Sequence, residues 1–352
     1  MKLKNMDRLI DLNPQTEDIE QFPEQFLREI AIGFERSQIF LTAFELKIFT
    51  KLKSPKTSKN LIQEMGLHPE IAARFLDVLT AMKLLCKNGE YYQTAPELIP
   101  FLVEGEPYFS PYLESACKER EIWMNIRKAL VEGPLSNKEK EIFSYTRESL
   151  EWTAKDCARG RLQKTLELVC ALPEFKSARR LIDLGGGHGL FAIGFAQENP
   201  NLEVILYDQP EIIGLAYNYI EKYSMQDRVR VLSGDYLQED FGIGYDIVFE
   251  ALSLEGGERE AKILYQKVAD VLNPGGLFIT QLFTLDDSET SPLSTLTLDL
   301  KEKITEHKQI HLMTNKRLFD LFDEVGLAGE QILNIPMGTD LQIRMVIARK
   351  KS

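Results

Sequence analysis

The sequence predicts an α/β protein, with a mainly helical N-terminal region and a Rossmann-like sheet of seven strands, mostly parallel, whose last hairpin is antiparallel. Three observations predict this class. Apolar strand-like segments alternate with helical ones from Leu181 to the C-terminus. The first of these segments runs directly into the glycine-rich stretch 185–189. Residues 17–170 instead place apolar side chains at three- and four-residue steps, the period of an amphipathic helix.

Length and composition are those of an ordinary globular chain. The 352 residues suffice for two domains with separate cores. The net charge of −12 argues against nucleic acid or an anionic membrane as a partner, because binding phosphates needs a surplus of Lys and Arg. The four cysteines are far apart and form no CxxC pair, which predicts reduced thiols in a cytoplasmic protein and no metal site. No apolar run approaches the roughly 18 residues that a membrane span needs.

The N-terminal region predicts a winged helix. Thr57 is placed to cap a short helix, and a second helix is expected over 70–85. A hairpin over 86–94 turns at Asn88-Gly89, a strong hairpin signal. Winged helices often bind DNA, but the second helix carries charges of both signs on an acidic protein. We therefore interpret this module as a dimerisation domain.

The domain boundary is expected after residue 105. A winged-helix dimerisation domain would span 1–105, and a second domain would span 106–352. In the second domain, helices over 106–175 would line a substrate site and a Rossmann-like core would occupy 176–352. The short connection between the last two strands predicts an antiparallel hairpin at the sheet edge. The strands expected in the core are 180–184, 203–207, 229–232, 245–250, 277–282, 330–335 and 342–348.

The glycines after the first strand predict a site for a nucleotide-like cofactor. They are spaced GxGxG, at Gly185, Gly187 and Gly189, whereas a dinucleotide site more often has GxGxxG. Asp183 precedes them, and an acid there would oppose a pyrophosphate. It suits a ligand that carries an ammonium and a sulfonium. S-adenosylmethionine (SAM) has both, so the sequence predicts SAM as the cofactor and S-adenosylhomocysteine (SAH) as its product.

Acids at the ends of the next two strands fit the same ligand. Asp208 closes the second strand, at the distance where a βαβ unit binds ribose hydroxyls. Asp235 follows the third strand, where a carboxylate can accept a hydrogen bond from the adenine amino group. Three acids in register with three strand ends predict a SAM site more strongly than the glycine pattern alone.

With these motifs, the chain resembles the caffeate/hydroxyindole-type O-methyltransferases, a class I SAM-dependent family with an N-terminal winged-helix dimerisation domain. The resemblance covers nearly the whole chain. Leu41–Phe49 is similar to the family's A-x-E-L-G-I-F helix, and Leu181–Gly189 to its D-x-G-G-G-x-G loop. Further similarity lies in the winged helix and in the family's F-D-L-P, G-D-F and L-x-P-G-G segments, which correspond to 57–85, 207–210, 234–236 and 273–276.

The resemblance implies roles for individual residues. Gly185 to Gly189 would hold the methionine end of SAM, Asp208 the ribose and Asp235 the adenine. Tyr236 would lie against the adenine ring. The predicted cofactor contacts are completed by Asp183, Gln209 and Glu250. The resemblance also implies a homodimer that acts on a small-molecule acceptor.

The segments that would meet the acceptor depart from the family pattern. The family has a His general base after its fourth strand, where this chain has Glu255, and an acid at the end of its fifth strand, where this chain has Gln281. Three interpretations remain open: Glu255 is the base, His307 or His311 is the base, or the acceptor needs no strong base. Each candidate also has an ordinary role, as a helix N-terminal acid or a solvated loop histidine. His188, inside the glycine loop, is expected near the cofactor carboxylate.

Aromatic side chains predict a pocket for a flat, apolar or aromatic acceptor, which would draw on Phe109, Tyr112, Trp123, Trp152 and Met313. The same side chains are equally suited to packing domains or protomers together. We expect methyl transfer from SAM to a small aromatic or heterocyclic acceptor, at a hydroxyl oxygen. The alternatives are a C-methyltransferase on a similar scaffold and a SAM-binding homologue that no longer transfers methyl groups. The sequence leaves open the acceptor, the base and whether a dimer shares its active sites.

Overall fold

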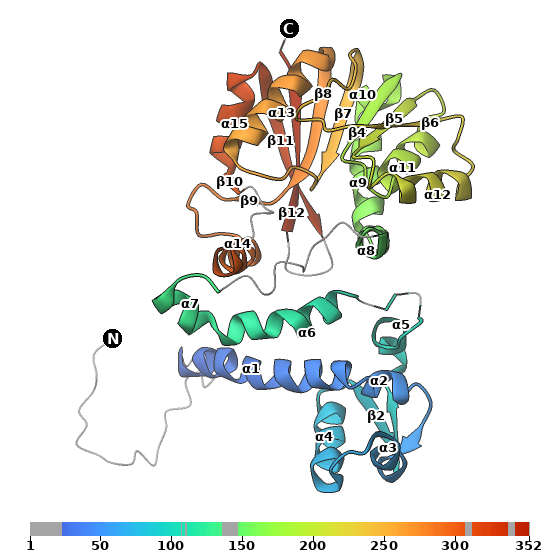
Figure 1. The fold of residues 1–352 in the computed structure, drawn as a ribbon, viewed down its shortest axis with the longest axis vertical. Helices are drawn as coiled ribbons and strands as arrows, with labels where there is room; N and C mark the ends of the chain where they lie inside the picture. The colour runs from blue at the N-terminus through green and yellow to red at the C-terminus, as the bar shows by residue number, and fades with distance from the viewer. Residues whose placement is uncertain are drawn as a thin grey trace, which may run out of the picture. The chain divides into compact units, whose positions relative to one another are not determined.

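The chain divides into two compact units, Met1–Arg120 and Glu121–Ser352 (Figure 1). The computed structural model describes residues 23–106, 108–109, 111–135, 147–306, 312–336 and 342–351. In these ranges we find no helix that is long and apolar enough to cross a membrane.

The N-terminal unit combines helices with a small sheet. Its helices are α1 (Pro23–Glu45), α2 (Ile48–Lys51), α3 (Ser58–Met65), α4 (Pro69–Ala81), α5 (Ile99–Leu102) and the greater part of α6 (Pro111–Met124). Three strands form the sheet in the order β1-β3-β2: β1 (Lys56–Thr57), β2 (Leu85–Asn88) and β3 (Tyr91–Thr94).

The local signals in this unit produce the elements that they predict. The Thr57 side chain caps α3 by accepting a hydrogen bond from the Asn60 N–H. β2 and β3 pair antiparallel, and the turn between them contains Gly89, with a φ of 59°. The helix expected over 70–85 ends at Ala81, because the chain turns and enters β2 at Leu85. Two helices followed by a hairpin give the order of elements found in a winged helix.

The segment after residue 105, expected to belong to the second domain, packs in part on the first unit. Phe109 stacks on Phe44 of α1, with ring centroids 5.5 Å apart. Cys117 of α6 packs against the same core. These contacts explain why the first compact unit extends to Arg120.

The C-terminal unit is built on a seven-stranded sheet with helices on both faces. The sheet contains β4 (Arg180–Leu184), β5 (Glu203–Asp208), β6 (Val229–Ser233), β7 (Tyr245–Ala251), β8 (Leu272–Leu282), β11 (Leu327–Pro336) and β12 (Gln342–Lys350). Two short strands, β9 (Thr284–Leu285) and β10 (Met313–Thr314), pair parallel with each other. The helices are α7 (Ile126–Glu132), α8 (Arg147–Cys157), α9 (Arg161–Cys170), α10 (Pro173–Ser177), α11 (Leu190–Glu198), α12 (Gly214–Lys222), α13 (Glu258–Val271), α14 (Leu293–Thr305) and α15 (Asn315–Glu324).

The strand order is β11-β12-β8-β7-β4-β5-β6. Strands β4 to β8 run parallel, and β12 is antiparallel to both of its neighbours, so the predicted sheet and its antiparallel last hairpin are confirmed. The chain moves outward from β4 to β5 and β6, then crosses back to place β7 on the other side of β4. Ligands of open α/β sheets bind at the carboxyl ends of the strands, where the order reverses in this way.

β8 begins earlier than the sequence predicts. The sequence predicts a start at 277, but the strand starts at Leu272 and includes Asn273–Gly276. Its pairing with β7 shifts register between Tyr245 and Ile247. The proline and glycines are therefore accommodated as an irregularity inside the strand.

Two helical layers enclose the sheet (Figure 1). Helices α9 to α12 cover one face, around a core that includes Phe175, Phe195 and Phe249. Helices α13 and α15 cover the other face, around Tyr265 and Phe322. The strands between these layers are buried on both sides, which explains their nearly continuous apolar sequences.

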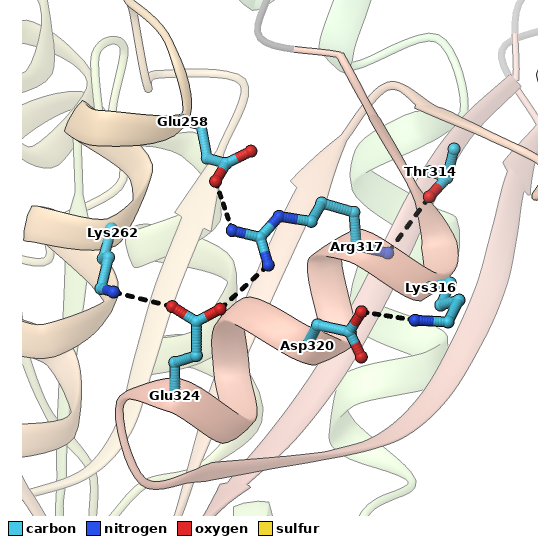
Figure 2. Close-up of polar contacts among 7 residues, drawn as sticks. All are labelled: Glu258, Lys262, Thr314, Lys316, Arg317, Asp320 and Glu324. Atoms are coloured by element: carbon cyan, nitrogen blue, oxygen red, sulfur yellow. Dashed lines mark hydrogen bonds and ion pairs between the residues drawn. The ribbon is translucent and has the colours of Figure 1, made fainter.

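An ionic cluster joins α13 to α15 at the surface (Figure 2). Arg317 pairs with Glu258 at the start of α13 and, at 2.9 Å, with Glu324 in its own helix. Lys262 of α13 also contacts Glu324, at 2.7 Å. Because these side chains are solvent-exposed, the cluster contributes more to orienting the two helices than to stability. It anchors α13 directly after the loop that carries Glu255.

Candidate active site

The glycine loop between β4 and α11 follows a backbone path that glycine adopts most easily. The φ angles are 64° at Gly185, 51° at Gly187 and 78° at Gly189. A β-carbon on Gly185 would lie 2.1 Å from the Cβ of Ser253, so the loop touches the segment that follows β7. The GxGxG spacing therefore places glycine at three left-handed positions, the first of which also lies in close contact with Ser253.

Asp183, next to last in β4, is buried, with 1% of its surface exposed. Its Oδ2 has no hydrogen-bond partner in the part of the chain that the structure describes. Burial, reinforced by the nearby Asp208 carboxylate, raises the pKa of Asp183 well above its usual value. A buried polar atom without a partner costs about 1–3 kcal/mol. A ligand with a cation or a donor would remove that cost.

Asp208, the last residue of β5, holds the glycine loop. Its Oδ2 accepts a hydrogen bond from the Gly187 N–H at 2.8 Å, and its Oδ1 accepts one from the Gln209 N–H at 2.7 Å. Burial raises the pKa of Asp208, although these two bonds act in the opposite direction. Each carboxylate oxygen has a second lone pair, so both can accept from a further donor.

The loop after β6 carries the two residues expected near adenine. The Asp235 carboxylate accepts hydrogen bonds from the Leu237 N–H at 2.8 Å and from Gln238 Nε2 at 2.6 Å. Tyr236 extends toward the segment after β7, where its hydroxyl donates to the Ser253 carbonyl oxygen at 2.7 Å. Asp235 thus shapes its own turn, and Tyr236 links that turn to the next loop.

Glu250, near the end of β7, is buried, and its carboxylate is bonded within the protein. Oε1 accepts from the Ser253 N–H at 2.7 Å, the Ser253 Oγ at 2.8 Å and the Leu254 N–H at 3.2 Å. Oε2 accepts from the Thr280 hydroxyl at 2.5 Å. Burial raises the pKa of Glu250, and the hydrogen bonds lower it. The sequence groups Glu250 with the cofactor contacts, whereas these four bonds tie it to neighbouring protein segments.

Arg161, at the start of α9, was not predicted as a site residue. It is 9% exposed, and its Nε and Nη1 have no partner among the described residues. Its guanidinium lies 5.4 Å from the centroid of the Phe191 ring, at the start of α11. Arg161 is buried on α9 together with Thr165 and Val169, at steps of one turn. A charged residue in register with that buried face is the sequence signal that identifies it.

His188 is buried within the glycine loop, and its Nδ1 accepts a hydrogen bond from the Leu190 N–H at 3.1 Å. Burial, together with the charge of Arg161, lowers the pKa of His188 to about 3. The ring is therefore neutral at physiological pH. Because Nδ1 accepts, the proton is assigned to Nε2. His188 can act as a hydrogen-bond donor here, and not as a general base.

Gln281, next to last in β8, has 0% of its surface exposed. Its Nε2 donates to Thr165 Oγ1 at 2.6 Å, and its Oε1 has no partner within the described ranges. Thr165 lies one turn after Arg161, and the thiol of Cys157 is within electrostatic reach of both Arg161 and Asp183. Unsatisfied polar groups from α9, β4 and β8 thus gather near the carboxyl edge of the sheet.

Comparison with known proteins identifies the family of this chain. An O-methyltransferase domain family matches residues 141–315, and an O-methyltransferase dimerisation domain family matches residues 29–97. The chain belongs to this O-methyltransferase family. As a member, it is a methyltransferase whose catalytic domain is built on the sheet described above.

Its relatives and structural neighbours agree with this assignment. An uncharacterized protein of Methanocaldococcus jannaschii is 31% identical over 76% of this chain and 73% of that protein. The N,N-dimethyltransferase OxyT of Streptomyces rimosus is 23% identical over 79% of this chain and 82% of that enzyme. The structure of an O-methyltransferase family protein from Burkholderia thailandensis superposes with a TM-score of 0.76 at 21% identity, covering 94% of this chain and 99% of that one.

The residues expected around the acceptor are spread over both units of the methyltransferase. Phe109 packs in the core of the N-terminal unit, and Met313 of β10 is buried in the core beneath α13 and α15. Trp123 and Trp152 are half-buried, and Tyr112 is 51% exposed. Phe109 and Met313 therefore each have a packing role within their own unit.

Of the three candidate bases of the methyltransferase, one lies among the residues that the structure describes. Glu255 is exposed in the loop between β7 and α13. His307 and His311 lie outside the described residues. Across the described ranges we find no group of three or more His, Cys, Asp or Glu side chains placed to hold a metal ion.

Proposed function

We propose that this methyltransferase transfers a methyl group from SAM to a hydroxyl oxygen of a small aromatic or heterocyclic molecule. The observation that carries the proposal is the pair of Asp183 and Arg161, buried with unsatisfied polar atoms near the glycine loop. A carboxylate oxygen without a partner suits an ammonium, and guanidinium nitrogens without partners suit a carboxylate. The methionine end of SAM carries both groups.

The residues of this chain fit the rest of the cofactor. Arg161, together with the Nε2–H of His188, would bind the SAM carboxylate, and Asp183 would bind the ammonium. Asp208 would bind the ribose, and Asp235 and Tyr236 would bind the adenine. When bound, SAM supplies an electrophilic methyl group on a sulfonium, and transfer of that group to the acceptor leaves SAH.

Oxygen is proposed as the acceptor atom because the matching family is one of O-methyltransferases. A hydroxyl must lose its proton as the methyl group arrives, unless it is already ionised. The candidates to take that proton are Glu255, His307 and His311. Because OxyT is named for dimethylation at nitrogen, an assay must detect a methyl group on either atom.

We further propose that the enzyme acts in the cytoplasm as a homodimer formed through its N-terminal unit. This unit matches the dimerisation domain. Helix α1 exposes large apolar side chains to solvent: Phe26 at 65%, Leu27 at 61%, Ile30 at 63% and Phe34 at 57%. A large apolar surface of this kind typically marks a protein interface, and a second copy of the chain would cover it. The four free cysteines suit a reducing compartment.

Calorimetric titration of the full chain with SAM and SAH tests the cofactor assignment. We expect both to bind, and Glu221→Gln, an exposed acid on α12, serves as a control with unchanged affinity. The enzyme is then incubated with SAM and a set of phenols and hydroxylated heterocycles, and SAH and methylated products are measured by mass spectrometry. Failure to bind SAM or SAH would refute the cofactor proposal. Binding with no SAH formed from any acceptor would refute the transfer reaction.

A further inference from the structure

Ser253 lies where three segments of the cofactor site meet. Its side chain packs against Gly185, so closely that a β-carbon there would be 2.1 Å from the Ser253 Cβ. Its Oγ lies 3.3 Å from the Leu184 carbonyl oxygen and 2.8 Å from Glu250 Oε1. Its own carbonyl oxygen accepts a hydrogen bond from the Tyr236 hydroxyl. One residue thus contacts the glycine loop, β7 and the loop after β6.

The chain reaches Ser253 through a strained turn. Leu252 has a φ of 58°, a left-handed conformation in which the β-carbon of leucine is crowded. Such a conformation persists only where neighbouring contacts hold it. The Leu252 N–H bonds to the Gln281 carbonyl oxygen at 2.9 Å. Glu250 Oε1 then accepts the next two backbone N–H groups, those of Ser253 and Leu254. Glu250 therefore stabilises the conformation that places Ser253.

We propose that Glu250 is a positioning residue, whose carboxylate holds Ser253 against Gly185 and in reach of Tyr236, and so shapes one wall of the SAM site without touching SAM. This inference rests on the proposed function. Both carboxylate oxygens are bonded to protein donors, three at Oε1 and the Thr280 hydroxyl at Oε2, so the protein itself holds the Glu250 carboxylate in place. The same turn continues to Glu255, so the placement of that candidate base also depends on Glu250.

A positioning role and a direct charge contact make opposite predictions for the amide. In Glu250→Gln, the side-chain oxygen still accepts from the N–H groups of Ser253 and Leu254. Its NH₂ group donates to Thr280, whose hydroxyl can turn to accept. Glu250→Ala removes both interactions. A contact with the SAM ammonium would instead require the negative charge, which the amide lacks.

The test is calorimetric titration of the full chain with SAH, together with thermal unfolding in the absence of SAH. We expect Glu250→Gln to keep most of the wild-type affinity and Glu250→Ala to bind SAH about tenfold or more weakly, as loss of several hydrogen bonds implies. The control is Glu221→Gln, on the surface of α12. Tyr236→Phe, which removes only the hydroxyl bonded to Ser253, should weaken SAH binding severalfold, with a smaller fall in the unfolding midpoint than Glu250→Ala shows.

The outcomes separate this inference from the proposed function. If the wild type does not bind SAH, the proposed function falls and this inference with it. If the wild type binds and Glu250→Gln is as weak as Glu250→Ala, the charge itself is required and positioning is refuted. Wild-type affinity in Glu250→Ala would also refute it. Should Glu250→Ala not fold, unchanged SAH affinity in Tyr236→Phe would overturn the inference.

Discussion

Gln281 and Thr165 are joined by a 2.6 Å hydrogen bond between Nε2 and Oγ1, across 116 residues of sequence. The bond ties the end of β8 to α9, the helix that begins with Arg161. It leaves Gln281 Oε1, like the Arg161 nitrogens Nε and Nη1, without a partner among the described residues. Buried groups in this state destabilise the folded chain until a ligand satisfies them.

The first prediction concerns Arg161. Arg161→Met should weaken SAM and SAH binding by roughly 10- to 100-fold, because a charge-assisted hydrogen bond contributes about 1.5–3 kcal/mol. The variant should be no less stable than the wild type without ligand, because the nitrogens it removes include two that lack protein partners. Calorimetric titration and urea unfolding measure the two quantities.

Arg228 provides the matched control for Arg161. Its Nη2 donates to the carbonyl oxygens of Ala196, Asn199 and Leu202, at 3.0, 2.7 and 3.0 Å. Arg228→Met should therefore lower stability, the reverse of the pattern expected at Arg161. If Arg161→Met lost stability and kept its affinity for SAH, Arg161 would have a structural role only.

The second prediction concerns the contact between the glycine loop and Ser253. Gly185→Ala should lower the free energy of unfolding by about 2–5 kcal/mol, from the left-handed backbone and the overlap with Ser253 together. Gly275→Ala is the control, with a φ of 77° but no atom within 4 Å of the added carbon. Gly275→Ala should lower the free energy of unfolding only by the cost of the left-handed backbone, about 1–2 kcal/mol. If urea unfolding gave the same loss of free energy of unfolding for both variants, the close contact between Gly185 and Ser253 would contribute nothing to that loss.

The third prediction concerns the pH dependence of stability. The pKa of His188 is about 3 in the folded chain, against about 6.5 for an unperturbed histidine. As the pH falls below about 6.5, the unfolded state binds a proton that the folded state does not, which removes about 1.4 kcal/mol per pH unit. His188→Asn keeps an acceptor for the Leu190 N–H and does not titrate. Its stability should fall less steeply between about pH 6.5 and 4.

Urea unfolding at several pH values measures this difference. The buried acids Asp183 and Asp208, whose pKa values are raised, act in the opposite direction, because they favour the folded state only while they are protonated. They are present in both proteins, so the difference between the two curves reports His188. Parallel curves for wild type and variant would show that the folded histidine titrates normally.

The fourth prediction concerns the general base. Glu255→Gln, His307→Asn and His311→Asn are compared for turnover and for SAH affinity. The variant of the residue that serves as base should lose about 10²- to 10⁴-fold in kcat, with SAH affinity unchanged. Full turnover in Glu255→Gln would remove Glu255 from the mechanism. Full turnover in all three would favour an acceptor that is already ionised or needs no base.

The strands could be predicted because a strand that is buried on both faces has a nearly continuous apolar sequence. Leu181–Leu184 and Val204–Tyr207 are apolar almost throughout and end beside glycines or an acid, and both lie where expected. The start of β8 was not predictable in the same way. The proline and glycines of Asn273–Gly276 are typical of turns, but the segment lies inside β8, between the pairs that Leu272 and Leu277 make with β7.

The roles of Glu250 and Ser253 could not be predicted in this way. Each depends on a partner that the fold brings from a distant segment, such as Thr280 for Glu250 and Gly185 for Ser253. No local pattern specifies those pairs. By contrast, Asp183 and the glycine loop follow one another in the chain, so a short motif was enough to single them out as candidate site residues.

Asp208 uses one carboxylate to hold the backbone of the glycine loop, and in the proposed function the same two oxygens would also bind the ribose of SAM. A glutamate there would carry its oxygens one methylene further and break the bonds to Gly187 and Gln209. A neutral residue would weaken both functions together. With the ribose bound as proposed, Asp208 therefore couples recognition of the cofactor to the shape of the glycine loop, and a change made for one would disturb the other.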